Sequence, residues 1–285
     1  MPICDPKGIR TMAKHSKTVV LSCVNLKGGV GKTAIAVNLA AYCGRKGLKT
    51  LLIDLDPQTN ATFSCISLED WEKHAAANGT VANLLGVRQH TSAEGKEKKA
   101  KDTVIQKVFG CIDLIPSHLD LFTVDLDLGS EVARETRLRR AVKDLLPAYD
   151  IVVCDCPPNL TIPTQNALAA STHYLVPVSP DFLSGLGIGL LLNRVQKFSD
   201  ALENSIALAG IVMSRVGRPS YFRAQTKETL RKAFGDKVLT AEIVERSAVS
   251  ESAAKNVPVF DMNDKSAAAE FTALGTELLK ILGFK

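Results

Sequence analysis

Lys27-Gly28-Gly29-Val30-Gly31-Lys32-Thr33 is the stretch of sequence that decides the fold of this chain. It follows an apolar run, Val19–Asn25, that is typical of a buried strand, and it leads into the helix-like segment Thr33–Lys46. A strand, a glycine-rich loop, Lys-Thr and a helix form the context of a phosphate-binding P-loop, in which backbone N–H groups and the helix N-terminus surround phosphate oxygens. The pattern therefore predicts that Lys32 reaches the β- and γ-phosphates of a nucleotide and that the Thr33 hydroxyl binds Mg²⁺.

The composition indicates a globular protein with a full apolar core. The chain has 285 residues, of which 46% are hydrophobic, and no run approaches the ~18 consecutive apolar residues of a membrane-spanning helix. Residues 1–17 are polar and basic without an apolar segment, so we expect a flexible N-terminal arm and not a secretory signal. The seven cysteines are scattered at apolar positions, which favours a reduced, cytoplasmic protein.

Apolar runs alternate with helical patterns along the chain, which predicts an α/β fold with a doubly wound, mostly parallel sheet and helices on both faces. We expect one domain over residues 18–285, with a mobile surface insertion at 88–103, where Ser, Gly, Glu and Lys dominate. The predicted strands are Val19–Asn25, Thr50–Asp54, Ile112–Pro116, Ile151–Asp155, His173–Val178 and Leu208–Met213. The predicted helices are Thr33–Lys46, Glu131–Leu146, Thr164–Ala170, Gly185–Phe198 and Ser220–Phe234.

Acidic residues stand at the ends of two of these strands. Asp56 follows the second strand in Asp54-Leu55-Asp56-Pro57-Gln58, and Asp155 ends the strand Ile151–Asp155. Ligands of such sheets bind at the carboxyl ends of the strands. Asp56 is therefore placed to orient or deprotonate an attacking water, and Asp155 fits the Walker B role of holding Mg²⁺.

Together these motifs resemble those of the ParA/MinD family of deviant Walker A ATPases, from Lys17 to near the end of the chain. The resemblance implies that Lys27 reaches the nucleotide of a second protomer, so that ATP binding and dimerisation are one event. It also implies that Lys27, Lys32 and Asp56 are catalytic and that Asp56 shares the Mg²⁺ with Thr33 and Asp155. The nucleotide-binding residues that it implies are Lys27, Gly28, Gly29, Val30, Gly31, Lys32, Thr33, Ala34, Ser214, Val244, Glu245 and Arg246.

Three positions depart from the pattern of this family. Ala34 stands where the family usually has a second Thr that contacts the α-phosphate. Val244-Glu245-Arg246 stands where relatives commonly carry Pro-Arg-Asn beside the adenine. Ala248 occupies a position where relatives often have a DNA-contacting Arg. Nucleotide affinity and the preference for ATP are the properties that the first two departures affect.

A concentrated basic segment suggests a polyanionic partner. Residues 215–237 carry seven basic and two acidic residues, a surplus equal to the net charge of +5 for the whole chain. Arg223, Lys227 and Arg231 are spaced four apart and share one helical stripe, which suits phosphate contacts better than base readout. A solvated amphipathic helix is the alternative. The predicted DNA-binding residues are Arg218, Arg223, Lys227, Arg231 and Lys232.

The leading interpretation is a cytoplasmic, nucleoid-associated ATPase that uses ATP and Mg²⁺, forms a homodimer with ATP and binds DNA non-specifically. A ParB-like or other adaptor on a plasmid, chromosome or other large cargo would stimulate hydrolysis. One alternative is a MinD-like membrane-associated ATPase, but the apolar C-terminal segment 271–284 has few cations and is expected to be a core helix, so no membrane partner is expected. The other alternative is a metabolic enzyme on the same scaffold.

Overall fold

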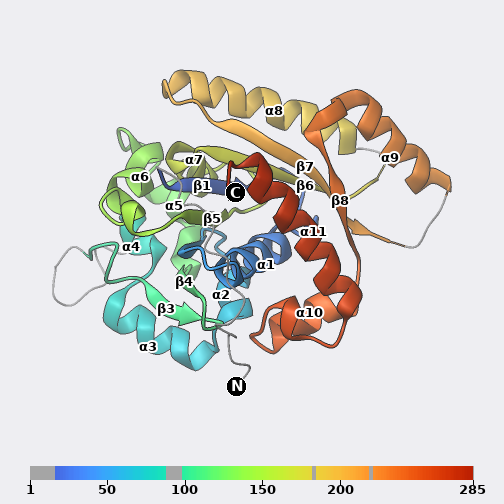
Figure 1. The fold of residues 1–285 in the computed structure, drawn as a ribbon. Coiled ribbons are helices and arrows are strands. Elements are labelled where there is room, and N and C mark those ends of the chain that lie inside the picture. The colour runs from blue at the N-terminus through green and yellow to red at the C-terminus, as the bar shows by residue number, and fades with distance from the viewer. Residues whose placement is uncertain (1–16, 88–97, 182–183, 218–220, 285) are drawn as a thin grey trace.

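The computed structural model describes residues 17–87, 98–181, 184–217 and 221–284. These residues build an eight-stranded sheet in the order β3-β4-β2-β5-β1-β6-β7-β8 (Figure 1). All neighbouring strands are parallel except β3 and β4, which are antiparallel. The strands are β1 (Val19–Cys23), β2 (Thr50–Asp54), β3 (Ile105–Val108), β4 (Ile112–Ile115), β5 (Ile151–Asp155), β6 (His173–Val178), β7 (Ala207–Val216) and β8 (Val238–Val244).

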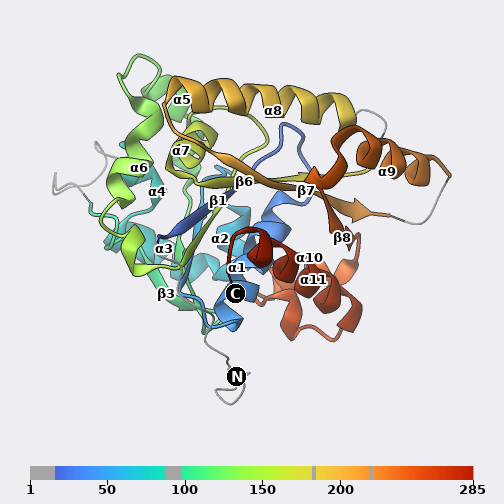
Figure 2. The same cartoon turned by 45° about the horizontal axis from the view of Figure 1, so that its top comes forward.

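Helices cover both faces of this sheet, as Figure 2 shows, with α8 on one face and α1 and α11 on the other. The central strands β1, β2 and β5 are buried at every residue, which explains their near-continuous apolar sequences. The helices are α1 (Lys32–Arg45), α2 (Asn60–Cys65), α3 (Leu68–Asn78), α4 (Val81–Leu85), α5 (Val124–Asp127), α6 (Arg137–Val142), α7 (Ile162–Ala170), α8 (Ser184–Ala201), α9 (Tyr221–Phe234), α10 (Ser247–Ala254) and α11 (Lys265–Ile281).

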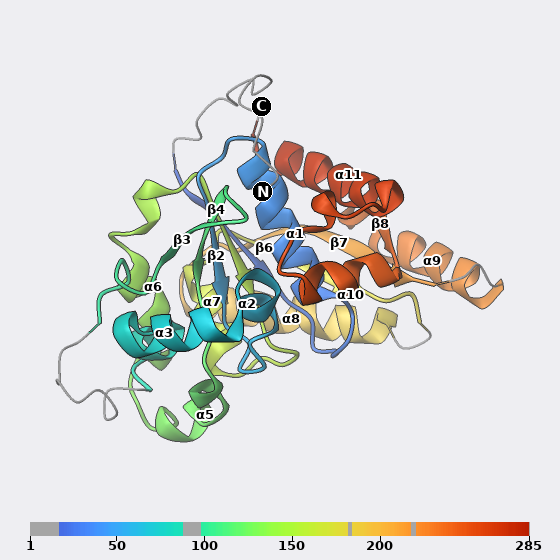
Figure 3. The ribbon, with the colours of Figure 1, turned by 90° about the horizontal axis from the view of Figure 1, so that it is seen from below.

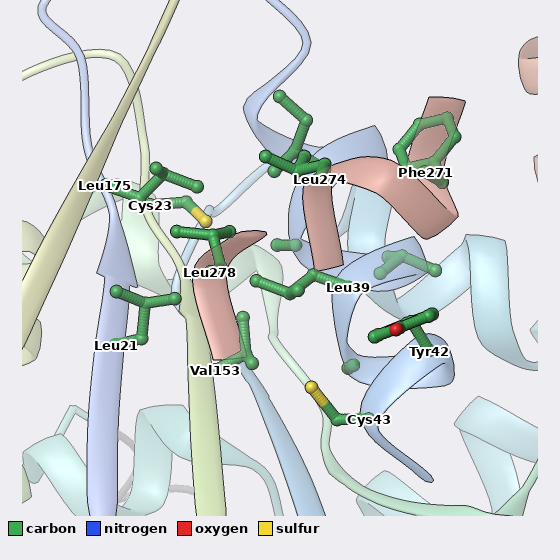
Figure 4. Packing of buried hydrophobic residues seen from close by; sticks show 14 of the residues in the cluster. Leu21, Cys23, Leu39, Tyr42, Cys43, Val153, Leu175, Phe271, Leu274 and Leu278 are labelled. Atoms are coloured by element: carbon green, nitrogen blue, oxygen red, sulfur yellow. The ribbon is translucent and has the colours of Figure 1, made fainter. Parts of the chain in front are cut away.

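The C-terminal helix α11 packs into the core beside α1, as the sequence predicts. Leu274 and Leu278 are fully buried and lie near Leu39 of α1 (Figure 4). The two helices approach so closely that a Cβ on Gly275 would lie 2.3 Å from Cδ1 of Tyr42, so only glycine fits there. Within the described residues, no helix combines the length and apolarity needed to cross a bilayer.

Side chains of α11 also bind the backbone of β8. The Glu277 carboxylate accepts hydrogen bonds from the backbone N–H groups of Thr240 and Ala241, at 2.8 Å each. The Glu270 carboxylate accepts one from Val244 N at 2.9 Å. Side chains of α11 therefore satisfy backbone donors of a strand that has a neighbour on one side only.

All six predicted strands are present, and two further strands, β3 and β8, were not predicted. The helix expected over Glu131–Leu146 is wrong in extent, because the chain there forms a short 3₁₀ turn at Arg134–Thr136, the helix α6 and a second 3₁₀ turn at Leu146–Ala148. The insertion expected at 88–103 does not extend to residue 103, since Ala100 and Thr103 are buried. Residues 88–97 and 1–16 of the expected insertion and arm lie outside the described residues.

Candidate nucleotide-binding site

A cavity of about 950 Å³ opens beside the glycine-rich loop between β1 and α1. Gly29 and Gly31 have φ angles of 73° and 83°, in the left-handed region that glycine adopts without strain. Figure 3 shows the helices α1, α2 and α10, each of which contributes residues to the cavity wall. Loop residues Gly28, Gly29, Gly31, Lys32, Thr33 and Ala34 line it, whereas the side chain of Val30 is buried in the protein.

Lys32 is a buried cation within this loop. Only 6% of the residue is exposed, and its Nζ donates to the backbone carbonyl of Lys27 at 3.0 Å. Burial lowers the pKa of Lys32, and the nearby carboxylates of Asp155 and Asp56 oppose that shift. A desolvated ammonium group at the start of a helix is well placed to bind phosphate oxygens.

Two carboxylates, Asp54 and Asp155, lie side by side where β2 and β5 end, since their Cα atoms are paired in the sheet register. Asp54 accepts hydrogen bonds from the Thr62 backbone N–H and hydroxyl and from Asp56 N, at 2.7 to 3.1 Å. Burial raises the pKa of Asp54 to about 7, although these hydrogen bonds oppose the shift. Asp54 therefore holds the turn that follows β2 through its hydrogen bonds to Asp56 and Thr62.

Asp155 differs from Asp54 because both of its buried carboxylate oxygens lack a hydrogen-bond partner among the described residues. Burial raises the pKa of Asp155, the charge of Asp54 adds to the rise, and the neighbouring Thr33 hydroxyl opposes it without forming a well-aligned hydrogen bond. Buried polar atoms of this kind need a partner. A divalent cation supplies one, and Thr33 and Asp155 fit such a cation.

The protein alone does not complete a metal site. Among the described residues, no group of three or more His, Cys, Asp or Glu side chains is arranged to hold a metal ion. Mg²⁺ typically binds through one or two protein oxygens, with water and substrate phosphates supplying the other ligands. The Thr33 hydroxyl and the Asp155 carboxylate beside a phosphate loop match that pattern, so ATP with Mg²⁺ is the pair that fits this site.

Asp56 faces the same cavity from the turn after β2. It is 6% exposed, and its Oδ1 accepts the backbone N–H of Gln58 at 2.9 Å. Burial raises the pKa of Asp56, while the Gln58 N–H and the positive charge of Lys32 lower it. One carboxylate oxygen is thus fixed by the turn, and Asp56 lines the same cavity as the phosphate loop.

The two lysines of the loop have opposite surroundings. The Lys27 side chain is 54% exposed, and its Nζ forms an ion pair with Asp181, which follows β6. Lys27 is absent from the cavity wall, whereas Lys32 is part of it. Lys32 therefore lines the cavity of its own protomer, whereas Lys27 faces solvent.

The cavity wall also contains the remaining residues that the resemblance assigns to nucleotide binding. Ser214, Val244, Glu245 and Arg246 all line the same cavity as the phosphate loop. The Arg246 guanidinium pairs with Glu270 at 2.7 Å, and that hydrogen-bonded carboxylate raises the pKa of Arg246. Here Arg246 is held by α11 at the edge of the site.

Several wall residues were not predicted as site residues. Arg215 lines the cavity and donates to the Gly29 carbonyl, but the sequence shows it only as one of many cations in a basic segment. Phe63, Ser64 and Asn38 also line it, and nothing in the local pattern marks them. Cys154 and Cys156 are fully buried on either side of Asp155 and pack within the core.

Four of the five predicted DNA-binding residues belong to α9, and the charges of the described ones are partly paired. Lys227 and Arg231 both contact Glu242 of β8, at 2.5 and 3.1 Å. Lys232 pairs with Glu228 one helical turn away, at 2.7 Å. Arg223 belongs to α9, but its side chain and the whole of Arg218 lie outside the described residues.

Comparison with known proteins agrees with this site. The model of the AAA domain family matches residues 18–208. The chromosome-partitioning ATPase Soj of Treponema pallidum is 31% identical over 89% of this chain and 92% of its own length. The chromosome partitioning protein ParA of Caulobacter vibrioides is 30% identical over 88% of this chain and 90% of its own.

A solved structure shares the fold. Cobyrinic acid a,c-diamide synthase from Mycobacterium smegmatis, crystallised with an ATP analogue and magnesium, has a TM-score of 0.76 and 24% identity, covering 93% of this chain and 96% of its own. The fold alone therefore does not distinguish a partition ATPase from a metabolic one. The identity of about 30% to Soj and ParA over most of the chain shows that the chain belongs to the ParA/Soj family of P-loop ATPases.

Proposed function

We propose that this ATPase binds ATP and Mg²⁺, dimerises with ATP, binds DNA without sequence preference and positions a large cargo such as a plasmid or chromosome. An adaptor protein on the cargo, similar to ParB, stimulates hydrolysis. The names of the relatives, a chromosome-partitioning ATPase and a chromosome partitioning protein, support the role in positioning.

The observation that carries this proposal is the exposed position of Lys27. A lysine that begins a phosphate loop but faces away from its own cavity is available to a nucleotide held by another protomer. Its ion pair with Asp181 is half-exposed and therefore weak, so exchanging it for a phosphate contact costs little. Lys27 thus supports a dimer in which each protomer completes the site of the other, like an arginine finger supplied in trans.

Exposed apolar side chains at the same edge of the sheet support this dimer. Leu119 and Phe122 follow β4 and are 54% and 62% exposed, and Leu186, in the first turn of the helix after β6, is 78% exposed. Parallel strands end at one edge, so all three residues follow strands that end where β1 enters the phosphate loop. We infer that these exposed apolar side chains lie in the dimer interface.

DNA binding rests on the basic face of α9. Lys227 and Arg231 share one carboxylate, Glu242, so this cluster keeps one unit of positive charge per protomer, to which Arg223 adds another. Few phosphate contacts per protomer give weak binding. Two protomers joined by ATP act together with a high effective concentration, so DNA binding is expected only with ATP.

The test is a DNA-binding titration on the intact chain with and without ATP and Mg²⁺, using duplexes of unrelated sequence. We expect ATP-dependent binding that is equal for all duplexes and falls steeply with salt, by about 0.9 log units per log unit of salt for each phosphate contacted. Arg223→Glu is expected to weaken it for every sequence, whereas Lys49→Glu, an exposed lysine at the start of β2, serves as the matched control. Equally tight binding without nucleotide, or strong sequence discrimination, would refute this proposal.

A further inference from the structure

Two adjacent residues at the end of β7 hold the phosphate loop. The Ser214 hydroxyl donates to the Val30 carbonyl, and Arg215 Nη1 donates to the Gly29 carbonyl at 2.8 Å. Each peptide unit is planar and trans, so fixing the Gly29 and Val30 carbonyls also fixes the direction of the next two N–H groups. Backbone N–H groups in such loops are the donors to phosphate.

The backbone at Arg215 is bent to make this contact. Its φ angle is 49°, in the left-handed region that residues other than glycine rarely adopt. The pairing of β7 with β8 shifts register between Met213 and Val216, which places a bulge at this point. A bulge beside a site redirects a side chain, and a strained residue persists where its surroundings fix it.

The surroundings that fix Arg215 come from β8. Arg215 Nε donates to Glu245 Oε1 at 3.0 Å, and Nη2 contacts the same oxygen. Glu245 directly follows β8, and its own N–H donates to the Val216 carbonyl at 3.1 Å. The guanidinium is thus held by a carboxylate on one side while it holds the loop carbonyl on the other, which its rigid fork of donors allows.

We propose that Arg215 is a positioning residue of the ATPase: it orients the phosphate loop through the Gly29 carbonyl, and Glu245 holds the guanidinium there. The inference rests on ATP binding at this site and is independent of DNA and cargo. It differs from a simple charge effect, in which Arg215 would attract phosphate and Glu245, a negative charge on the same cavity wall, would repel it.

The first test compares two substitutions of the arginine. Arg215→Ala is expected to raise the Kd for ATP and the KM roughly tenfold, while kcat at saturating ATP stays within about twofold, because a loosened loop must be ordered by the ligand. Arg215→Lys keeps the charge but not the fork, so it is expected to recover only a small part of the loss. Full recovery with lysine would mean that charge suffices, and the proposal would be wrong.

Glu245→Gln gives opposite signs for the two models. If Glu245 holds Arg215 in place, the substitution is expected to lower ATP affinity by about threefold, because one half-exposed ion pair is lost. If Glu245 instead repels phosphate, the same substitution is expected to raise ATP affinity. In a double-mutant cycle, Glu245→Gln is expected to cause no further loss of ATP affinity in the Arg215→Ala background, because Glu245 then has no guanidinium to hold.

The matched control is Arg45→Ala. Arg45 also forms a partly exposed ion pair, with Asp261, but it ends α1 and is absent from the cavity wall. The ATP affinity of Arg45→Ala is expected to equal that of the wild type. The Tm of each variant is also measured, which separates an effect on the phosphate loop from a loss of folding. A wild type that does not bind ATP would reject the proposed function. If the wild type binds ATP and a folded Arg215→Ala binds it with equal affinity, only this inference is overturned.

Discussion

The centre of the sheet and its β7–β8 end carry charges in different ways. At the centre, Lys32, Asp56 and Asp155 are buried where β1, β2 and β5 end, and burial shifts the pKa of each. At the β7–β8 end, half-exposed ion pairs join neighbouring elements, such as Arg215 with Glu245. Electrostatic interactions are strong where water is excluded and weak where it is not. We therefore expect the centre to determine chemistry and the end to adjust geometry and affinity.

The largest expected effect is on turnover at the buried centre. Asp56→Ala is expected to lower ATP hydrolysis by about 100-fold or more, the range for loss of a positioned acid–base group, while ATP binding and dimerisation persist. Measuring phosphate release and ATP affinity on the same preparation distinguishes a loss of hydrolysis from a loss of ATP binding. Normal turnover would show that another group orients the attacking water.

Next in size is the loss of the buried cation. Lys32→Ala is expected to weaken ATP binding roughly 10- to 100-fold, because charge-assisted hydrogen bonds contribute roughly 1.5–3 kcal/mol. Equilibrium titration with a fluorescent ATP analogue provides the measurement. Lys46→Ala, an exposed lysine at the other end of α1, is the control. Affinity that stays within about threefold for Lys32→Ala would overturn the assignment of the phosphate loop.

Lys27 tests whether an exposed charge can matter as much as a buried one. Lys27→Ala is expected to bind ATP as a monomer with unchanged affinity, and to weaken the ATP-dependent dimer by about tenfold, since its contact forms only across the interface. Light scattering over a range of concentrations measures the dimer. An unchanged dimer would show that Lys27 acts within its own protomer, for example through Asp181.

The smallest expected effect concerns the ion pairs beneath the basic face of α9. Glu242→Gln removes the carboxylate that Lys227 and Arg231 share, so DNA affinity in the presence of ATP is expected to rise two- to fivefold, about the strength of exposed ion pairs. The salt dependence becomes steeper at the same time. Glu228→Gln, which frees only Lys232, is the matched comparison on the same helix. Unchanged DNA affinity for Glu242→Gln would indicate that this face does not contact DNA.

The sequence predicted the centre of the sheet better than its β7–β8 end, for physical reasons. A phosphate loop and acids at strand ends are local patterns, and fully buried strands such as Ile151–Asp155 are recognisable as apolar runs. Edge strand β3 has two exposed residues out of four and carries little apolar signal. The role of Arg215 depends on a bulge and on Glu245, thirty residues away, which no local pattern reveals. Likewise, helical spacing places Lys227 and Arg231 together but does not reveal Glu242 beneath them.

The carboxylates of α11 along β8 have a consequence for self-assembly. A strand at the edge of a sheet exposes backbone donors that can template the strand of another molecule, which leads to aggregation. Glu277 and Glu270 accept hydrogen bonds from three backbone N–H groups of β8, which are therefore not available to the strand of another molecule. Sheet-to-sheet addition through these donors is therefore disfavoured along β8, which protects this edge against aggregation by strand pairing.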